Sequence, residues 1–118
     1  MSYANSLLQA DDPNILFTRA EDFFNRGLHR EAWAACLSGC LGVFAMHDSV
    51  SFPVDATEYD CLNLVCQTLP DEEANFRALV QSWVLFAYGD RLPMEGDFEQ
   101  ALHYGRSLLE ARGLANES

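Results

Sequence analysis

The chain has 118 residues, of which 49% are hydrophobic and 12% aromatic, so it can bury the core of one domain and is not a disordered protein. Its net charge of −11 argues against nucleic acid as a partner, which needs a basic surface, and against docking on anionic lipid. We expect a single domain over 1–118, with 1–11 and 114–118 loosely ordered.

No apolar run reaches the roughly 18–20 residues of a membrane span, because Ser38 and Gly39 interrupt the densest stretch, 32–46. The N-terminus has no basic region and carries Asp11 and Asp12 early, so it does not resemble a signal peptide. We therefore expect a cytoplasmic protein without membrane insertion, whose four cysteines are thiols and not disulfides.

The first expected helix runs from Pro13 to about Arg26. Asp12 is a good cap residue, and proline suits the first helical position. Gly27 would end this helix, and its inward residues are expected to be Leu16, Ala20, Phe23 and Phe24. A second helix over 29–46 follows after so short a connection that the two should form an antiparallel hairpin.

After a loop over 47–54, a short helix is expected over 56–68. Asp55 would cap it, and Glu58 would return a bond to the N–H of the cap residue, as in a capping box. Its buried edge is expected to consist of Tyr59, Leu62, Val65 and Cys66.

The helix over 70–88 is expected to be the central one. Its apolar residues recur at helical spacing, and the wide apolar stripe predicts packing on two sides. The stripe consists of Phe76, Leu79, Val80, Trp83, Val84 and Ala87, widened by Leu85 and Phe86. Pro70 would begin this helix, and Gly89 would end it in a left-handed conformation.

A last helix is expected to begin at Pro93 or Asp97 and to end near Arg112, before Gly113. Its inner face would consist of Phe98, Ala101, Leu102, Gly105, Leu108 and Leu109. No segment has the pattern of a strand. The sequence therefore predicts an all-α fold, a compact antiparallel bundle of about five helices.

Two segments, 26–41 and 95–110, resemble each other. Each has a glycine, then a glutamate or glutamine followed by alanine, then apolar residues at helical spacing. Gly27 and Gly96 are separated by about twice the ~34 residues of a tetratricopeptide repeat. The region between them lacks that repeat's pattern, so we favour two similar amphipathic helices and keep the repeat as the alternative.

Three parts of the chain, in order, resemble one family: REAWAACLSGCLGVF with DATEYDCLNLV, then NFRALVQSWVLFAYGDRLP, then DFEQALHYGRSLLE. They resemble the helical domain of unknown function found at the cytosolic C-terminal end of bacterial membrane proteins, often behind a transglutaminase-like domain. The resemblance covers roughly 27–112. Its more specific matches are Asp55, Glu58 and Tyr59 at the start of one helix, and Phe86, Tyr88, Gly89 and Pro93 at the end of the next.

The resemblance implies a helical fold and a cytosolic context, and it supplies no catalytic residues. Since we find no membrane span, it implies either a stand-alone relative or a segment of a larger protein.

The residues that could carry chemistry do not form a recognisable site. Cys36 and Cys40 share a helix face and could give two metal ligands, but Cys61 and Cys66 are turned about 140° apart on theirs. Spacing does not show which cysteine could meet His29, His47 or His103 as its base, and the histidines are most simply surface residues. The carboxylates fall mainly in first turns of helices, where they cap. We therefore expect no metal, no cofactor and no enzymatic activity.

The candidate interaction or structural-motif residues are Trp33, Glu58, Tyr59, Trp83, Tyr88 and Gly89. The Tyr88 ring is expected to cover the junction with the last helix, with its hydroxyl on a loop carbonyl. Trp33 and Trp83 could line a groove, although aromatic residues at helical spacing belong more often to the core.

We expect a non-enzymatic cytosolic interaction domain of unknown specific role. It would dock a partner helix, or the cytosolic part of a membrane complex, through an apolar groove. The alternative is a tetratricopeptide-like adaptor or chaperone that binds an extended segment. A protein partner is expected in either case, and a homo-oligomer is left open.

Overall fold

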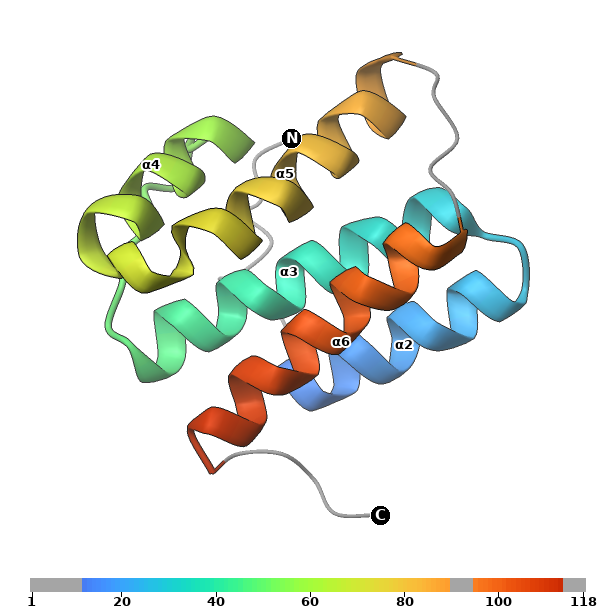
Figure 1. Ribbon diagram of the computed structural model, residues 1–118, viewed down its shortest axis with the longest axis horizontal. Helices are drawn as coiled ribbons and strands as arrows, with labels where there is room; N and C mark the ends of the chain where they lie inside the picture. Colours follow the sequence, from blue (N-terminus) through green and yellow to red (C-terminus); the bar gives the residue numbers. More distant parts are fainter. Residues whose placement is uncertain (1–11, 90–94, 114–118) are drawn as a thin grey trace.

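The computed structural model describes residues 12–89 and 95–113, which form five α-helices and a 3₁₀ turn and contain no strand (Figure 1). The elements are α2 (Pro13–Asn25), α3 (His29–His47), α4 (Glu58–Thr68), η1 (Pro70–Glu72), α5 (Glu73–Gly89) and α6 (Glu95–Ala111). One cluster of buried apolar side chains draws on all five helices. The predicted all-α bundle is therefore confirmed.

The α2–α3 hairpin forms as predicted. Asp12 Oδ1 accepts a hydrogen bond from the Asn14 N–H at 2.8 Å, and Pro13 is the first helical residue. Gly27 lies in the turn with φ +80°, a conformation that glycine adopts without strain. This tight turn brings α2 and α3 side by side along their length (Figure 1).

The helix at the centre of the bundle is α3, and the prediction that the 70–88 helix would be central is wrong in this respect. α3 contacts α2, α5 and α6, and ten of its residues are buried, compared with four in α5. Its small residues, among them Cys36, Gly39 and Cys40, let neighbours approach from several sides. α5 packs against α3 and α4 and also contacts α6, but it exposes Arg77 and Gln81 on its outer side.

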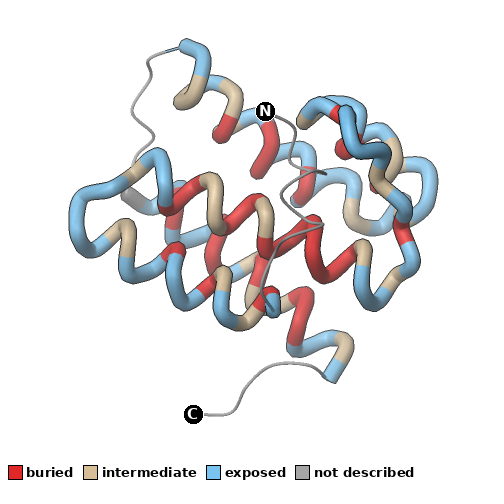
Figure 2. Tube along the Cα trace, turned by 180° about the vertical axis from the view of Figure 1, so that it is seen from behind, coloured by how far each residue is buried: buried red, intermediate tan, exposed pale blue. Residues whose placement is uncertain are grey.

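Buried stretches lie where the helices face one another, and the outer sides are exposed (Figure 2). Phe17, on α2, is 1% exposed, whereas the neighbouring Leu16, predicted to point inward, is only partly buried. The Phe17 ring lies against the backbones of Gly39 on α3 and Gly105 on α6, and a Cβ at Gly39 would be 2.6 Å from its Cε1 atom. Three helices thus meet at one aromatic ring.

The other residues of α2 that were predicted to point inward differ in how far they are buried. Ala20 is fully buried, and Phe23 and Phe24 are partly buried against the core. Phe24 stacks on Phe98 of α6, with ring centroids 4.4 Å apart.

The start of α4 differs from the prediction by two residues. Thr57, and not Asp55, is the cap residue: the Asp60 N–H donates to Thr57 Oγ1 at 3.2 Å, and the Thr57 N–H donates to Asp60 Oδ2 at 3.1 Å. The predicted pair, Asp55 with Glu58, and the observed pair, Thr57 with Asp60, have the same spacing, and both fit the pattern of a capping box. The Thr57 start is compatible with the burial of Ala56, which is 2% exposed, in the turn before the helix.

The buried edge of α4 also differs in part. Leu62 and Val65 are buried as predicted, together with Cys61, but Tyr59 is 49% exposed. Cys66 is partly buried.

The ends of α5 and α6 complete the bundle. Pro70 begins the 3₁₀ turn η1, and α5 continues from it. Gly89 is the last residue of α5 and has no left-handed φ, contrary to the prediction, whereas Gly113 after α6 does, at +69°. The predicted inner face of α6 is buried in full. Predictions about 1–11, 114–118 and Pro93 fall outside the described residues.

Candidate functional site

Four of the predicted interaction residues come together at one end of the α4–α5 hairpin. Tyr88 Oη, near the end of α5, donates to Glu58 Oε1, in the first turn of α4, at 3.1 Å. Tyr59 follows Glu58 in the chain, and Gly89 follows Tyr88. Tyr88 is 68% exposed and Tyr59 is 49% exposed.

Leu85 adds an aliphatic side chain to this end of the hairpin. It lies one helical turn before Tyr88, on the same side of α5, and is 50% exposed. We call Tyr59, Leu85 and Tyr88 the hairpin-end patch.

The structure gives Tyr88 a partner that the sequence did not predict. The ring is exposed, and its hydroxyl donates to the Glu58 carboxylate, whereas the predicted place over the junction with α6 concerns 90–94, outside the described residues. Partial burial and the nearby Glu58 carboxylate raise the pKa of Tyr88, against the opposing effect of Arg30. The hydroxyl is therefore protonated at neutral pH and can donate this hydrogen bond.

Trp33 and Trp83 belong to the core. Their exposed fractions are 1% and 4%. The Trp33 ring meets the Phe98 ring edge to face, with centroids 5.6 Å apart. The prediction that these two tryptophans belong more readily to the core than to a groove is confirmed.

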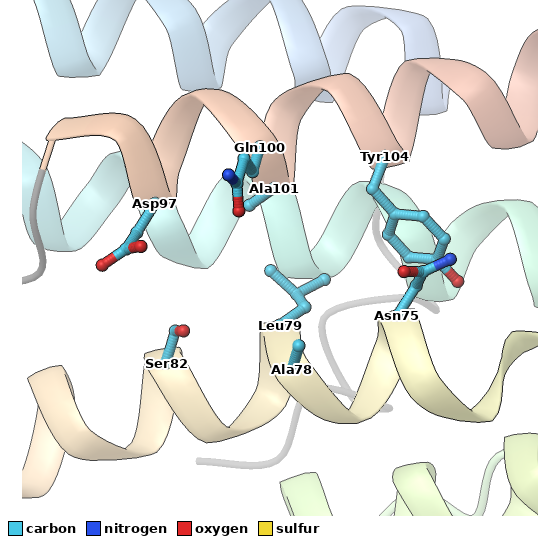
Figure 3. Close-up of a pocket in the computed structure, with 8 residues that line it drawn as sticks. All are labelled: Asn75, Ala78, Leu79, Ser82, Asp97, Gln100, Ala101 and Tyr104. Carbon is cyan, nitrogen blue, oxygen red and sulfur yellow. The ribbon is translucent and has the colours of Figure 1, made fainter.

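A hollow of about 110 Å³ lies between α5 and α6 (Figure 3). α5 lines it with Asn75, Ala78, Leu79 and Ser82, and α6 lines it with Asp97, Gln100, Ala101 and Tyr104. We call it the α5–α6 groove. Unlike the predicted apolar groove, it has a mixed lining, with amide, hydroxyl and carboxylate groups above the buried Leu79 and Ala101.

The polar side chains of the groove are distributed along its length. Asp97 and Ser82 face each other toward one end, and Tyr104 and Asn75 lie together at the other (Figure 3). Sequence reasoning missed this groove because its walls belong to two different helices, and the sequence pattern does not show how these pack against each other. The available signal was the run of small and polar residues beside the apolar stripe of α5.

Tyr104 links the groove to a network of charged side chains. Its hydroxyl donates to Glu72 Oε1 at 2.9 Å, and Glu72 Oε2 lies 3.8 Å from Arg112 Nη2. Burial, the nearby Cys40 and the Glu72 carboxylate raise the pKa of Tyr104, so its hydroxyl stays a donor.

Arg112 anchors the network to the end of α3. Its Nε and Nη2 atoms donate to Asp48 Oδ2 at 2.9 and 2.6 Å, and its Nη1 donates to the Leu108 carbonyl at 2.9 Å. The guanidinium lies 5.9 Å from the centroid of the Phe44 ring. The network joins the ends of α3 and α6 to η1, which fits a structural role.

The cysteines are poorly placed for nucleophilic chemistry. Burial, and a hydrogen bond between the Cys36 and Cys40 thiols, raise the pKa of Cys40, and burial raises that of Cys61 to about 11. Both are therefore thiols at neutral pH, whereas a nucleophile must be a thiolate. Over 12–89 and 95–113, no three His, Cys, Asp or Glu side chains are grouped as metal ligands.

Within the part of the chain that the structure describes, no helix combines the length and apolar character needed to cross a bilayer. The resemblance to the bacterial C-terminal helical domain stays a prediction. Comparison of the chain with protein-family models, with curated proteins and with solved structures finds no match.

Proposed function

We propose that this protein is a cytoplasmic, non-enzymatic interaction domain whose hairpin-end patch contacts apolar side chains of a protein partner. The observation that carries the proposal is the exposure of Tyr59, Leu85 and Tyr88 at one end of the α4–α5 hairpin, at 49%, 50% and 68%. Large aromatic side chains are the usual anchors of protein interfaces, since they bury much area and lose little conformational entropy.

The charge of the surface suggests a basic partner. All seven basic residues of the chain are arginines, set against 18 acidic ones. Four of the arginines form ion pairs with acidic side chains: Arg26–Asp22, Arg77–Glu73, Arg106–Glu21 and Arg112–Asp48. Glu58 and Asp60 flank Tyr59, so a basic segment with an apolar anchor complements this surface.

Two other observations bear on the alternatives. α6 contacts both helices of the α2–α3 hairpin, which closes that side of the bundle and favours a docking domain over a tetratricopeptide-like array. The resemblance to a cytosolic membrane-protein domain suggests the cytosolic side of a membrane complex as the place to seek the partner.

Site-specific photo-crosslinking in the native cell tests the proposal. A photoreactive phenylalanine replaces Tyr59 or Tyr88, and Met46, which is 62% exposed at the end of α3, provides the control position. We expect a cross-linked protein from both patch positions and none from Met46. The cross-linked segment should be basic and carry a large apolar side chain.

The purified partner segment then gives a quantitative test. The Leu85→Ala/Tyr88→Ala double variant should weaken its binding at least tenfold in calorimetry, while Met46→Ala leaves it unchanged. Equal binding by all three proteins would disprove the role of the patch. Light scattering across a dilution series reports the other outcome, in which the patch joins two copies of this chain.

A further inference from the structure

Helices α2, α3 and α6 pack together as one unit, although α4 and α5 separate α6 from the other two in the chain. Each of the three contacts the other two. Phe17 lies so close to Gly39 and Gly105 that neither glycine has room for a side chain. Phe98 of α6 stacks on Phe24 of α2, with ring centroids 4.4 Å apart. We call α2, α3 and α6 the three-helix unit.

The α4–α5 hairpin, with η1 between its two helices, is a second unit. It lies in the chain between α3 and α6, and α4 packs mainly on η1 and α5 (Figure 1). Tyr88 Oη of α5 donates to Glu58 Oε1 of α4 at 3.1 Å, and Arg77 Nη2 of α5 lies 3.8 Å from Cys66 Sγ of α4. The two helices of the hairpin are therefore held together by contacts of their own.

The η1 end of the hairpin is fastened to the three-helix unit. Phe76, near the start of α5, meets Phe44 of α3 edge to face, with ring centroids 5.3 Å apart. Glu72 of η1 accepts a hydrogen bond from the Tyr104 hydroxyl at 2.9 Å and lies 3.8 Å from Arg112 Nη2. Farther along α5, the α5–α6 groove leaves a hollow between the hairpin and α6 (Figure 3). The packing between the two units is therefore less dense than the packing within the three-helix unit.

We propose that the α4–α5 hairpin opens as a unit while α2, α3 and α6 stay folded. Native proteins open in cooperative segments, and a segment with fewer packing contacts opens at a lower free energy. Opening breaks the contacts of Glu72 and separates Phe76 from Phe44, whereas the junction at Phe17 stays intact. The open state exposes the side of α3 that the hairpin covers, including Phe44.

This inference goes beyond the proposed function and does not depend on it, because opening is a property of the chain alone. It also bears on that function, since Tyr59, Leu85 and Tyr88 move with the hairpin. A partner that binds the hairpin-end patch more tightly in one of the two states shifts the population toward that state.

Cys40 of α3 is a natural reporter of this opening. It is 0% exposed and lies one helical turn before Phe44, on the same side of α3. Burial raises the pKa of Cys40, and the neighbouring Cys36 thiol and Glu72 carboxylate add to this effect, which places the thiol near η1. A thiol reagent therefore reaches Cys40 only in molecules that have opened.

Labelling of the native chain with N-ethylmaleimide, followed by mass spectrometry, measures the opening. Cys66, which is partly exposed, should react first. We expect the opening constant derived from the Cys40 labelling rate to exceed the global unfolding constant from urea about 100-fold. Ala20→Cys places a thiol at a fully buried position of the three-helix unit, and this thiol should react only as fast as global unfolding of the same variant allows. An opening constant at Cys40 equal to the global unfolding constant would overturn the inference.

Matched variants test whether the hairpin separates at the predicted contacts. Glu72→Ala removes the contacts of η1 with α6 and should raise the Cys40 labelling rate about tenfold. Glu21→Ala breaks the ion pair with Arg106, which joins α2 to α6 inside the three-helix unit, and should leave the Cys40 rate unchanged. An equal response to both variants, or no response to Glu72→Ala, would refute opening between these two units.

Discussion

The ring of Phe17 occupies the space that a side chain at Gly105 would need. A Cβ on Gly105 of α6 would collide with the ring atoms of Phe17 on α2, and the Gly39 backbone of α3 lies on the same ring. These two glycines therefore set how closely three helices approach one another.

Gly105→Ala should destabilise the protein by about 1–3 kcal/mol, because the added methyl group overpacks a full core. Thermal or urea unfolding measures the change. Gly96→Ala in the same helix is the control, since a Cβ there meets nothing within 4 Å. It should be neutral, or stabilising by up to about 1 kcal/mol from helix propensity. Equal effects of the two substitutions would contradict the packing of Phe17 on α6.

The cap of α4 gives a second prediction. Thr57→Ala removes the hydroxyl that accepts the Asp60 N–H and should cost about 1 kcal/mol, whereas Asp55→Ala should change stability by less than about 0.5 kcal/mol. Urea unfolding of both variants decides between the two capping boxes that the sequence allows. A larger loss for Asp55→Ala would place the helix start where the sequence first suggested it.

The Arg112 network gives a third prediction. Arg112→Ala breaks an ion pair whose side chains are only 17% and 18% exposed, and should cost about 1–3 kcal/mol because Asp48 loses its charged donor. Arg26→Ala breaks a pair in which both side chains are more than 60% exposed, and should cost less than about 0.5 kcal/mol. If urea unfolding gave similar losses in the free energy of unfolding for the two variants, Arg112 would be as exposed to solvent as Arg26.

Alkaline pH should destabilise the fold, because the pKa of Cys61 rises from 9.0 to about 11 on folding. Burial is the main cause, and the Asp60 and Glu58 carboxylates add to it. Above pH 9 the unfolded chain loses this thiol proton while the folded chain keeps it, so stability present below pH 9 is lost as the pH rises toward 11.

Urea unfolding between pH 7 and 10.5, in the presence of a reductant, measures the loss. Cys61→Ala should show a shallower decline than the unmodified chain, although Tyr104 and Cys40, whose pKa values are also raised, leave part of the slope in place. Parallel profiles would show that the Cys61 thiol titrates in the folded protein as it does in the unfolded chain.

Local patterns predicted most of the secondary structure. Asp12 and Pro13 marked the start of α2, and the apolar spacing of α6 identified its whole buried face. Periodicity could not choose between Leu16 and Phe17, because both are apolar and the choice depends on glycines in two other helices. The prediction chose Asp55 with Glu58 for the start of α4, whereas the structure has Thr57 with Asp60, because the pattern near the helix start fits both pairs and the buried Ala56 precedes the helix.

The site was predictable only in part. Glu58, Tyr59 and Tyr88 stood out as motif residues, and the hairpin brings them together. Their partners in space could not be read from the sequence, nor could the groove, whose walls belong to two different helices. Contacts between distant segments depend on how whole helices pack.

The unequal burial of the cysteines provides a built-in attachment point for a probe. Cys36, Cys40 and Cys61 are enclosed in the core, while Cys66 is partly exposed on α4, beside Arg77 of α5. A thiol-reactive spin label or fluorophore should therefore attach to Cys66 in the folded chain without any substitution. Placed on the hairpin that carries the patch, it would report when that hairpin is covered or displaced.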